Sequence, residues 1–372
     1  MFARRLFYLS GFDPRGARFY HDLHREQIAR RAERIGQPIT VSGRSRGEGK
    51  SFEWTVESAA EGTNTRVTFL RWDDIVGRAW VKGHLNLFIQ TLRTYARNAL
   101  LLKWWTGWKL GRGPMIAMSY PPLFVAGLPL LIGLPIVLLM MLVLPWWAAI
   151  AVAAVPAAWL TRILIVKMRA CWLVRLFIYT DAIAAGGMPV DLAERLDDFA
   201  AQISEALDEG LDEVLLVAHS NGSILAVPIM LRLLELRGGK LPENFTLVTY
   251  GHCIPMLTGR RDAHWFHAML HAISRHDFAW VDIGSPPDGA AFSLIDPLLP
   301  EATHGAIRLT LLSPRFHCFY DPENYRLDYA SKYDAHFDYL RCGDRVSPLD
   351  MPSLSCAARP ISAAIAEFRT IP

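Results

Sequence analysis

The sequence has few charged residues and no cysteine motif. Of its 372 residues, 20% are charged and 52% are hydrophobic, and the net charge is only +3. No Lys/Arg-rich run is interleaved with aromatic residues, so we expect no nucleic-acid partner. An apolar core is missing behind Arg4 and Arg5, so we expect no signal peptide. The five cysteines are odd in number and lack CxxC spacing, which predicts reduced thiols in a cytosolic compartment; they are Cys171, Cys253, Cys318, Cys342 and Cys356.

Charge is absent altogether from one long segment. Residues 113–161 contain no Asp, Glu, Lys, Arg or His over 49 positions, which is too long and too apolar for a buried hairpin of a globular protein. A membrane-spanning helix needs about 20 apolar residues. We therefore predict a hairpin of two transmembrane spans, near 122–144 and 146–166, with a tight turn at 145–147.

Basic residues flank this segment on both sides, while its turn is uncharged. They are Lys103, Lys109 and Arg112 before it, and Arg162, Lys167 and Arg169 at its end. Positive residues stay on the cytoplasmic side, so both ends of the hairpin should face the cytoplasm. Tryptophans suited to an interfacial belt are Trp104, Trp105, Trp108, Trp159 and Trp172. The chain then divides into 1–112, the hairpin 113–166 and 167–372, and the two outer parts can form one domain.

Outside the apolar segment, strand-like and helix-like patterns alternate. Strands are predicted at 6–10, 38–42, 52–57, 66–70, 214–217, 245–250 and 278–283. Helices are predicted at 17–35, 77–102, 190–207, 223–236 and 262–274, and residues 44–50 form a charged turn. This alternation predicts an α/β fold with a mainly parallel sheet and helices on both faces.

One serine interrupts the apolar stretch V-L-L-V-A-H-S-N-G-S-I-L at 214–225. Ser220 falls on a sharp turn between a buried strand and a helix, at the carboxyl edge of the sheet. Such a turn exposes the hydroxyl and places backbone N–H groups where a developing oxyanion would need them. The usual pattern is small-x-Ser-x-Gly, and here it reads Ala218-His219-Ser220-Asn221-Gly222. We therefore predict that Ser220 is a nucleophile.

A nucleophilic serine needs a base and an acid, and both types of residue follow it. His336 lies in a polar and aromatic stretch, 333–340, which we predict to be a loop. Asp282 and Asp288 lie at the end of the strand 278–283 and in the proline-rich loop after it. The histidine would take the serine proton, and an aspartate would orient the histidine. Asp288 follows two prolines that stiffen the loop, whereas Asp282 lies among apolar neighbours and also suits a structural role.

With these residues the chain resembles the α/β-hydrolase superfamily, and most of all its lipase/esterase members, some of which carry Ala-His-Ser-x-Gly at this turn. The resemblance covers 10–13 and 190–340 but not the hairpin. It implies ester hydrolysis by a triad of Ser220, an Asp and His336, with no metal or other cofactor. The acid of such enzymes lies just past its strand, which favours Asp288. The resemblance also implies an oxyanion hole formed by the N–H of Asn221 and that of Phe12 or Asp13.

Other histidines offer competing explanations. His264, His267 and His271 share one face of a predicted helix and could bind zinc, although no carboxylate or cysteine partner accompanies them. His252-Cys253 and His317-Cys318 could suggest a cysteine nucleophile or a pair of ligands, but adjacent side chains on a strand point to opposite faces, so neither pair would act together. His21, His24 and His219 suit packing or surface positions, and His276 and His304 are the next candidates for a base.

These features predict a membrane-anchored serine hydrolase that cleaves an ester or thioester of a lipid or another acyl compound. Its hydrolase domain would lie in the cytoplasm, at the plasma or inner membrane. The alternative is a non-catalytic membrane scaffold or binding protein that keeps the same fold. A labelled fluorophosphonate separates these two functions because it reacts only with an activated serine.

Overall fold

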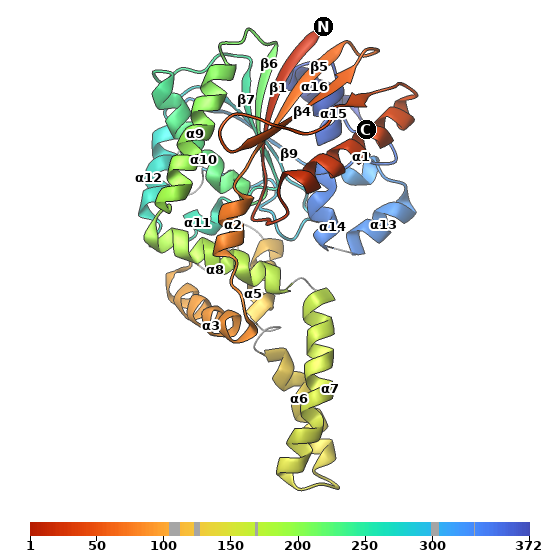
Figure 1. Ribbon diagram of the computed structural model, residues 1–372, viewed down its shortest axis with the longest axis vertical. Coiled ribbons are helices and arrows are strands. Elements are labelled where there is room, and N and C mark those ends of the chain that lie inside the picture. The colour runs from red at the N-terminus through yellow and green to blue at the C-terminus, as the bar shows by residue number, and fades with distance from the viewer. Residues whose placement is uncertain (104–111, 123–126, 168–169, 299–304, 331) are drawn as a thin grey trace.

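A nine-stranded, mostly parallel sheet forms the centre of the molecule (Figure 1). The computed structural model describes residues 1–103, 112–122, 127–167, 170–298, 305–330 and 332–372. The strand order is β2-β4-β5-β1-β6-β7-β8-β9, and β3 pairs with β4. The parallel strands are β1 (Phe2–Leu9), β5 (Thr63–Leu70), β6 (Glu213–His219), β7 (Phe245–Tyr250), β8 (Ala279–Ile283) and β9 (Arg308–Leu312). The antiparallel ones are β2 (Thr40–Val41), β3 (Ser45–Arg46) and β4 (Ser51–Ser58). The predicted α/β fold with a mainly parallel sheet is confirmed.

Alternate residues of the strands enter two hydrophobic cores on opposite faces of the sheet. In β6, Val214, Leu216 and Ala218 belong to one core, and Leu215 and Val217 belong to the other. The first core is covered by α9 (Val190–Ala206), α10 (Gly222–Leu236) and α12 (His264–Ile273). The second is covered by α1 (Gly16–Ile35), α15 (Met351–Cys356) and α16 (Ile361–Thr370). Helices therefore cover both faces, as the run of strands buried on both sides predicts.

Several element boundaries differ from the prediction. The single helix expected at 77–102 is wrong, because the chain forms α2 (Asp73–Ala79) and α3 (His84–Leu101), separated by a break in which Gly83 has a φ of +79°. The expected strand 38–42 is reduced to β2, and the stretch 44–50 contains the short strand β3. Elements without a sequence prediction include β9, α8 (Ala170–Gly186), α11 (Pro255–Thr258), α13 (Pro322–Ala330) and α14 (Lys332–Phe337), as well as α15 and α16. The expected loop 333–340 is thus mainly helical.

The described part of the charge-free segment forms three helices rather than two. α5 (Arg112–Pro122) packs against α8, and α6 (Leu128–Met140) and α7 (Trp146–Lys167) lie side by side and project away from the sheet (Figure 1). At 1.5 Å per residue α7 is about 33 Å long, whereas α6 is about 20 Å long. Among the described residues, Trp146–Val166 is the one single helix long and apolar enough to cross a bilayer.

The predicted hairpin therefore needs correction at its first span and its turn. In the described part of the span expected at 122–144, the apolar helix is the 13-residue α6, and the turn lies at 141–145 instead of 145–147. The bent pair α8 and α9 passes the same test of length and composition only when it is counted as one span. Residues 123–126 and the predicted flanking residues Trp104, Trp105, Trp108, Lys109 and Arg169 lie outside the described part of the chain.

The pair of α6 and α7 packs through small residues and exposes large ones. Ala149, Ala153 and Ala157 are buried along one side of α7, and a Cβ placed on Gly133 of α6 would lie 3.6 Å from the Cβ of Ala157. Small residues at this spacing let two helices approach closely. The exposed side chains include Leu130, Leu131, Leu134, Leu138, Val155, Trp159 and Val166. Exposed apolar side chains gathered in this way mark contact with a membrane or another apolar partner.

Candidate active site

Ser220 lies on the sharp turn between β6 and α10. Its φ is +57°, in the left-handed region that residues other than glycine rarely adopt. Two hydrogen bonds fix the turn: Ser220 N donates to Tyr250 O at 2.8 Å, and Ser223 Oγ donates to Ser220 O at 2.6 Å. Such backbone strain costs roughly 1–3 kcal/mol and collects at functional sites. The turn therefore holds the serine in one position at the carboxyl edge of the sheet.

Two glycines make this close packing possible. A Cβ on Gly222 would lie 2.7 Å from Leu9 O and 2.8 Å from Ser10 O, which is the collision that the small-x-Ser-x-Gly pattern avoids. A Cβ on Gly11 would lie 3.0 Å from the Cβ of Ser220 and 3.2 Å from its Oγ. Because β1 and β6 are parallel neighbours, the loop after β1 reaches the serine.

The two predicted oxyanion donors have unused backbone N–H groups. In the part of the chain that the structure describes, neither Phe12 N nor Asn221 N donates a hydrogen bond. The Phe12 ring stacks on the rings of Trp80 and Tyr179, with centroids 5.6 and 4.9 Å away, and anchors its loop. The positive end of the α10 dipole also lies at the serine turn. Free donors on an anchored loop are what an oxyanion hole requires.

Asp288 and His336 form a hydrogen-bonded pair. Asp288 Oδ2 lies 2.8 Å from His336 Nδ1. The same oxygen accepts a hydrogen bond from the Tyr339 hydroxyl at 3.0 Å, and Asp288 Oδ1 accepts one from Ala290 N at 2.9 Å. Both side chains of the pair are buried. The two residues are 48 positions apart in the sequence, and the short helix α14 carries the histidine to the proline-rich loop.

The surroundings of Asp288 favour its charged form. Burial acts to raise the pKa of this carboxyl group, but the charge and hydrogen bond of His336 act against it. With the further hydrogen bonds from Ala290 and Tyr339, the pKa of Asp288 lies below its usual value. A carboxylate that accepts the proton on Nδ1 leaves Nε2 as the ring atom able to take a proton.

His219 connects this pair to the serine turn. Its Nε2 lies 2.9 Å from His336 O, and the centroids of the two rings are 4.8 Å apart. A carbonyl oxygen only accepts, so His219 Nε2 carries the proton and donates it. Burial, assisted by the charge of His336, lowers the pKa of His219 to about 3, so its ring is neutral near pH 7.

Asp282, the other candidate acid, interacts with Thr249 and His252 instead of His336. Its Oδ1 accepts a hydrogen bond from Thr249 Oγ1 at 2.6 Å, and its Oδ2 lies 3.8 Å from His252 Nε2. Burial raises the pKa of Asp282, although His252 and Thr249 act in the opposite direction. The structure thus places Asp288, and not Asp282, within hydrogen-bond distance of His336.

Cys253 is a neighbour of the serine that sequence reasoning misses. Its Sγ lies 3.9 Å from Ser220 Oγ, and its N donates to Ser223 Oγ at 2.9 Å. Burial raises the pKa of this thiol to about 12, although the hydrogen bond with Ser220 acts to lower it. The available signal was its position just after β7, because the carboxyl ends of neighbouring parallel strands meet at one edge.

The Ser220 hydroxyl is not hydrogen-bonded to the candidate base. Within the described residues, no hydrogen bond joins Ser220 Oγ to His336, and the Cys253 thiol is the partner of the hydroxyl. Catalytic hydrogen bonds are often long or absent before substrate binds. The structure therefore brings Ser220, Asp288 and His336 into one cluster, without a hydrogen bond between Ser220 Oγ and His336.

The remaining described histidines have other partners or are exposed to solvent. Among the described residues, no group of three or more His, Cys, Asp or Glu side chains could hold a metal ion. On α12, His264 and His271 are exposed, and His267 Nε2 forms a hydrogen bond with Arg260 O at 3.2 Å. His276 Nδ1 bonds to Gly239 O at 3.1 Å, and His304 lies outside the described residues.

Helices next to the apolar pair cover the candidate site. Trp172 of α8 donates from Nε1 to Phe12 O at 2.9 Å, and its ring centroid lies 5.5 Å from that of Tyr333 on α14. At the start of α5, a Cβ on Gly113 would lie 3.4 Å from Gly289 Cα, beside Asp288. The site thus lies on the side of the sheet from which α6 and α7 project (Figure 1).

No protein-family model matches the chain, and no curated protein or solved structure was found to be similar to it.

Proposed function

We propose that the protein is a membrane-anchored serine hydrolase of the α/β-hydrolase type that cleaves a carboxylic ester or thioester. The observation that supports this most is the Asp288–His336 hydrogen bond, formed beside the strained turn that carries Ser220. The three residues follow one another in the order serine, acid, histidine, which is the order of α/β-hydrolases.

The proposed reaction proceeds through an acyl-enzyme. Ser220 Oγ attacks the acyl carbon while His336 Nε2 takes its proton and then gives it to the departing alcohol or thiol. Asp288 stabilises the positive charge that forms on the imidazole. The N–H groups of Phe12 and Asn221 donate to the oxyanion. Water, activated by His336, then releases the carboxylic acid and restores the serine.

The anchor of this enzyme is the pair α6 and α7, which we propose to be inserted in the membrane as a two-span hairpin. Its leucine, valine and tryptophan side chains include many that are exposed in the described part of the chain. The basic residues on both flanks favour an orientation with the two ends of the pair on the cytoplasmic side. A hairpin of this kind would keep the hydrolase domain at the cytoplasmic surface of the plasma or inner membrane.

A lipid or another acyl compound of the bilayer is the substrate class that this geometry favours. The loop that carries Asp288 contacts the start of α5, the last described helix before α6. The candidate site therefore lies near the membrane surface, where acyl chains are concentrated. The chemistry needs no metal or organic cofactor.

Labelling with a fluorophosphonate tests the proposed activity. The full chain in detergent should be labelled, and Ser220→Ala should abolish labelling. Ser10→Ala is a matched control, because Ser10 Oγ is a buried hydroxyl of the neighbouring loop with no hydrogen-bond partner among the described residues. This control should keep wild-type labelling.

The alternative function, a non-catalytic membrane scaffold or binding protein, is favoured by the missing Ser220–His336 hydrogen bond and by the 8% exposure of Ser220. A folded wild-type protein that resists the probe at every concentration, and hydrolyses no acyl ester in a chain-length series, would support this alternative.

A further inference from the structure

Helix α3 exposes apolar residues and buries polar ones, which is the reverse of the arrangement typical of a soluble protein. Its exposed residues include Leu85, Phe88, Ile89, Leu92 and Leu100, which are between 37% and 76% exposed. At 100° per residue these five side chains occupy an arc of about 120° on one side of the 18-residue helix. A helix of a soluble protein directs such a stripe toward its core.

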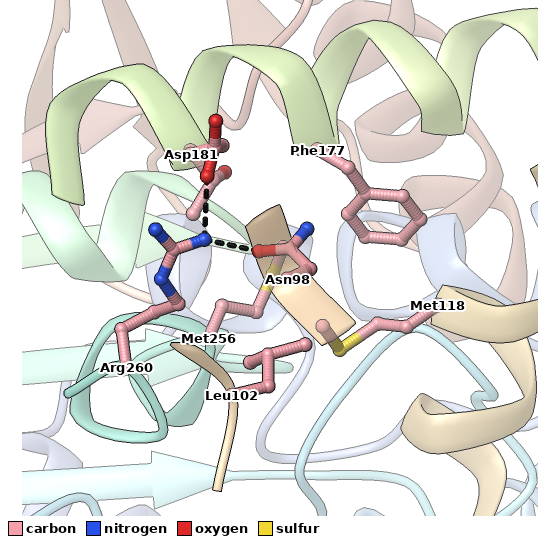
Figure 2. A pocket seen from close by; sticks show the side chains of 8 residues that line it. Asn98, Leu102, Met118, Phe177, Asp181, Met256 and Arg260 are labelled. Carbon is pink, nitrogen blue, oxygen red and sulfur yellow. Dashed lines mark hydrogen bonds and ion pairs between the residues drawn. The ribbon is translucent and has the colours of Figure 1, made fainter. Parts of the chain in front are cut away.

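The buried side of α3 is largely polar. Thr91, Thr94 and Asn98 are buried there beside Leu87. Figure 2 shows Asn98 facing Arg260, which is also bonded to Asp181 of α8. Burying a polar amide is costly unless it is hydrogen-bonded, so this network fixes the rotation of α3 and keeps its apolar arc directed outward.

The apolar arc lies in the part of the molecule next to the proposed anchor. α3 contacts α5 and α8, which lie between the sheet and the pair α6 and α7 (Figure 1). Polar residues border the arc: Asn86, Arg93 and Arg97 follow it around the helix, and Arg93 is exposed. Basic side chains beside an apolar stripe suit the boundary between lipid head groups and acyl chains.

We propose that the exposed face of α3, formed by Leu85, Phe88, Ile89, Leu92 and Leu100, is a membrane-docking surface that lies parallel to the bilayer in its interfacial region. The proposal rests on the membrane anchoring described under Proposed function. The α6–α7 pair would then pass into the membrane while α3 rests on it. Together they would hold the hydrolase domain in one orientation, because a hairpin alone leaves the domain free to tilt.

Spin labels on the full chain in nanodiscs of phosphatidylcholine and phosphatidylglycerol test this docking. Single cysteines are introduced as Leu85→Cys and Leu92→Cys on the apolar face. Asn86→Cys, an exposed position on the polar border, is the matched control. The background carries Cys171→Ser and Cys318→Ser, since these two native thiols are partly exposed. Accessibility is measured to oxygen, which partitions into lipid, and to a water-soluble nickel chelate.

The ratio of oxygen to nickel accessibility should be severalfold higher at 85 and 92 than at 86. Equal and strong nickel accessibility at all three positions would overturn the proposal. Protection of 85 and 92 from both reagents, with spin–spin broadening, would also overturn it, because a second copy of the chain would then cover the face.

A label at Val155→Cys on α7 separates this result from failure of the anchor. If Val155 lies in lipid while Leu92 lies in water, the docking surface is wrong and the anchor stands. If Val155 itself lies in water, the proposed anchor is wrong. Hydrolysis of a soluble short-chain ester should be unchanged in all these variants, because none of them alters a residue near Ser220.

Discussion

Nε2 of His219 donates a hydrogen bond to the carbonyl oxygen of His336. His219 directly precedes the candidate nucleophile, so this contact ties the backbone of the candidate base to the serine turn. Its geometry requires a proton on Nε2, and the low pKa of this buried ring keeps His219 neutral, so the ring is the Nε2–H tautomer. We infer that His219 positions the base without taking part in proton transfer.

His219→Phe should lower kcat about tenfold and leave KM nearly unchanged. Phenylalanine keeps an aromatic ring but leaves the His336 carbonyl unpaired, which costs about 1–3 kcal/mol, and about 1.4 kcal/mol of barrier height corresponds to a tenfold rate change. His219→Gln, which retains an N–H donor, should recover part of the loss. Rates are measured per active site titrated with fluorophosphonate. A purely structural residue would lower stability and leave that normalised rate unaltered.

Ser220→Ala and His336→Ala should each remove nearly all ester hydrolysis, and the double variant should be hardly worse. Members of a triad act as a unit, so their losses do not add. Steady-state rates with a soluble ester, together with circular dichroism to confirm folding, provide the test. Near-full turnover in His336→Ala would mean that another residue is the base. His276 and then His304 would be the next to test.

Asp288→Asn should reduce turnover by roughly 10⁴-fold, because the histidine would lose control of its tautomer. Asp282→Asn is the matched control, since it alters a buried carboxyl group that bonds to Thr249 instead of His336. It should mainly lower the denaturation midpoint. The opposite pattern, with activity lost only in Asp282→Asn, would reverse the assignment of the acid.

Acid should destabilise the fold through His24. Its Nδ1 accepts a hydrogen bond from Trp54 Nε1 and its Nε2 bonds to Ser355 Oγ, and burial lowers its pKa from 6.5 to about 3. The unfolded chain therefore binds more protons below pH 6.5, and stability falls as the pH is lowered from about 6.5 to about 3. At pH 5 the loss from this one group should be about 2 kcal/mol.

The measurement for His24 is the difference in unfolding free energy between pH 7 and pH 5, in wild type and in His24→Gln, which cannot titrate in this range. Other titrating groups cancel in the comparison of the two proteins. The variant should show a pH effect smaller by about 2 kcal/mol; identical effects in both proteins would contradict a neutral buried His24.

Reporter fusions should give cytoplasmic signals at residue 100 and at the C-terminus, and an external signal at 145, if α6 and α7 both span the membrane. If the reporter at 145 were cytoplasmic or inaccessible, with the other two unchanged, the hairpin would enter and leave the membrane through the same leaflet and would not span it. An external C-terminus would contradict the single sheet, which joins β1 to β6.

The sequence allowed a correct prediction of the parallel strands whose pattern is continuous. β6, β7 and β8 are buried on both faces, so most of their residues are apolar, and Phe245–Tyr250 matches its predicted range. The strands β2 and β3 have only two residues each and are too short to produce a comparable signal, and the edge strand β9 is only partly buried. Helix α3 was joined to α2 because both are helical by composition, and only the tertiary structure reveals the turn at Gly83.

The candidate site was partly predictable because its chemistry is local. A serine flanked by small residues between a strand and a helix is visible in the sequence, whereas the choice between Asp288 and Asp282 depends on which carboxylate α14 reaches. Tyr339 and Cys253 could not be assigned from sequence, because their roles arise from contacts with residues 51 and 33 positions away.

The place of β1 in the sheet has a consequence for the order of events during synthesis. Its neighbour β6 is joined to it by the buried ion pair of Arg4 and Glu213, 209 positions apart. The ribosome must synthesise all residues between β1 and β6, including the apolar helices, before β6 can pair with β1. Until β6 is made, this edge of β1 has no partner strand, and the N-terminal half of the chain is therefore prone to aggregation. A membrane that captures α6 and α7 early would hold this incomplete half in place until its partner strand arrives.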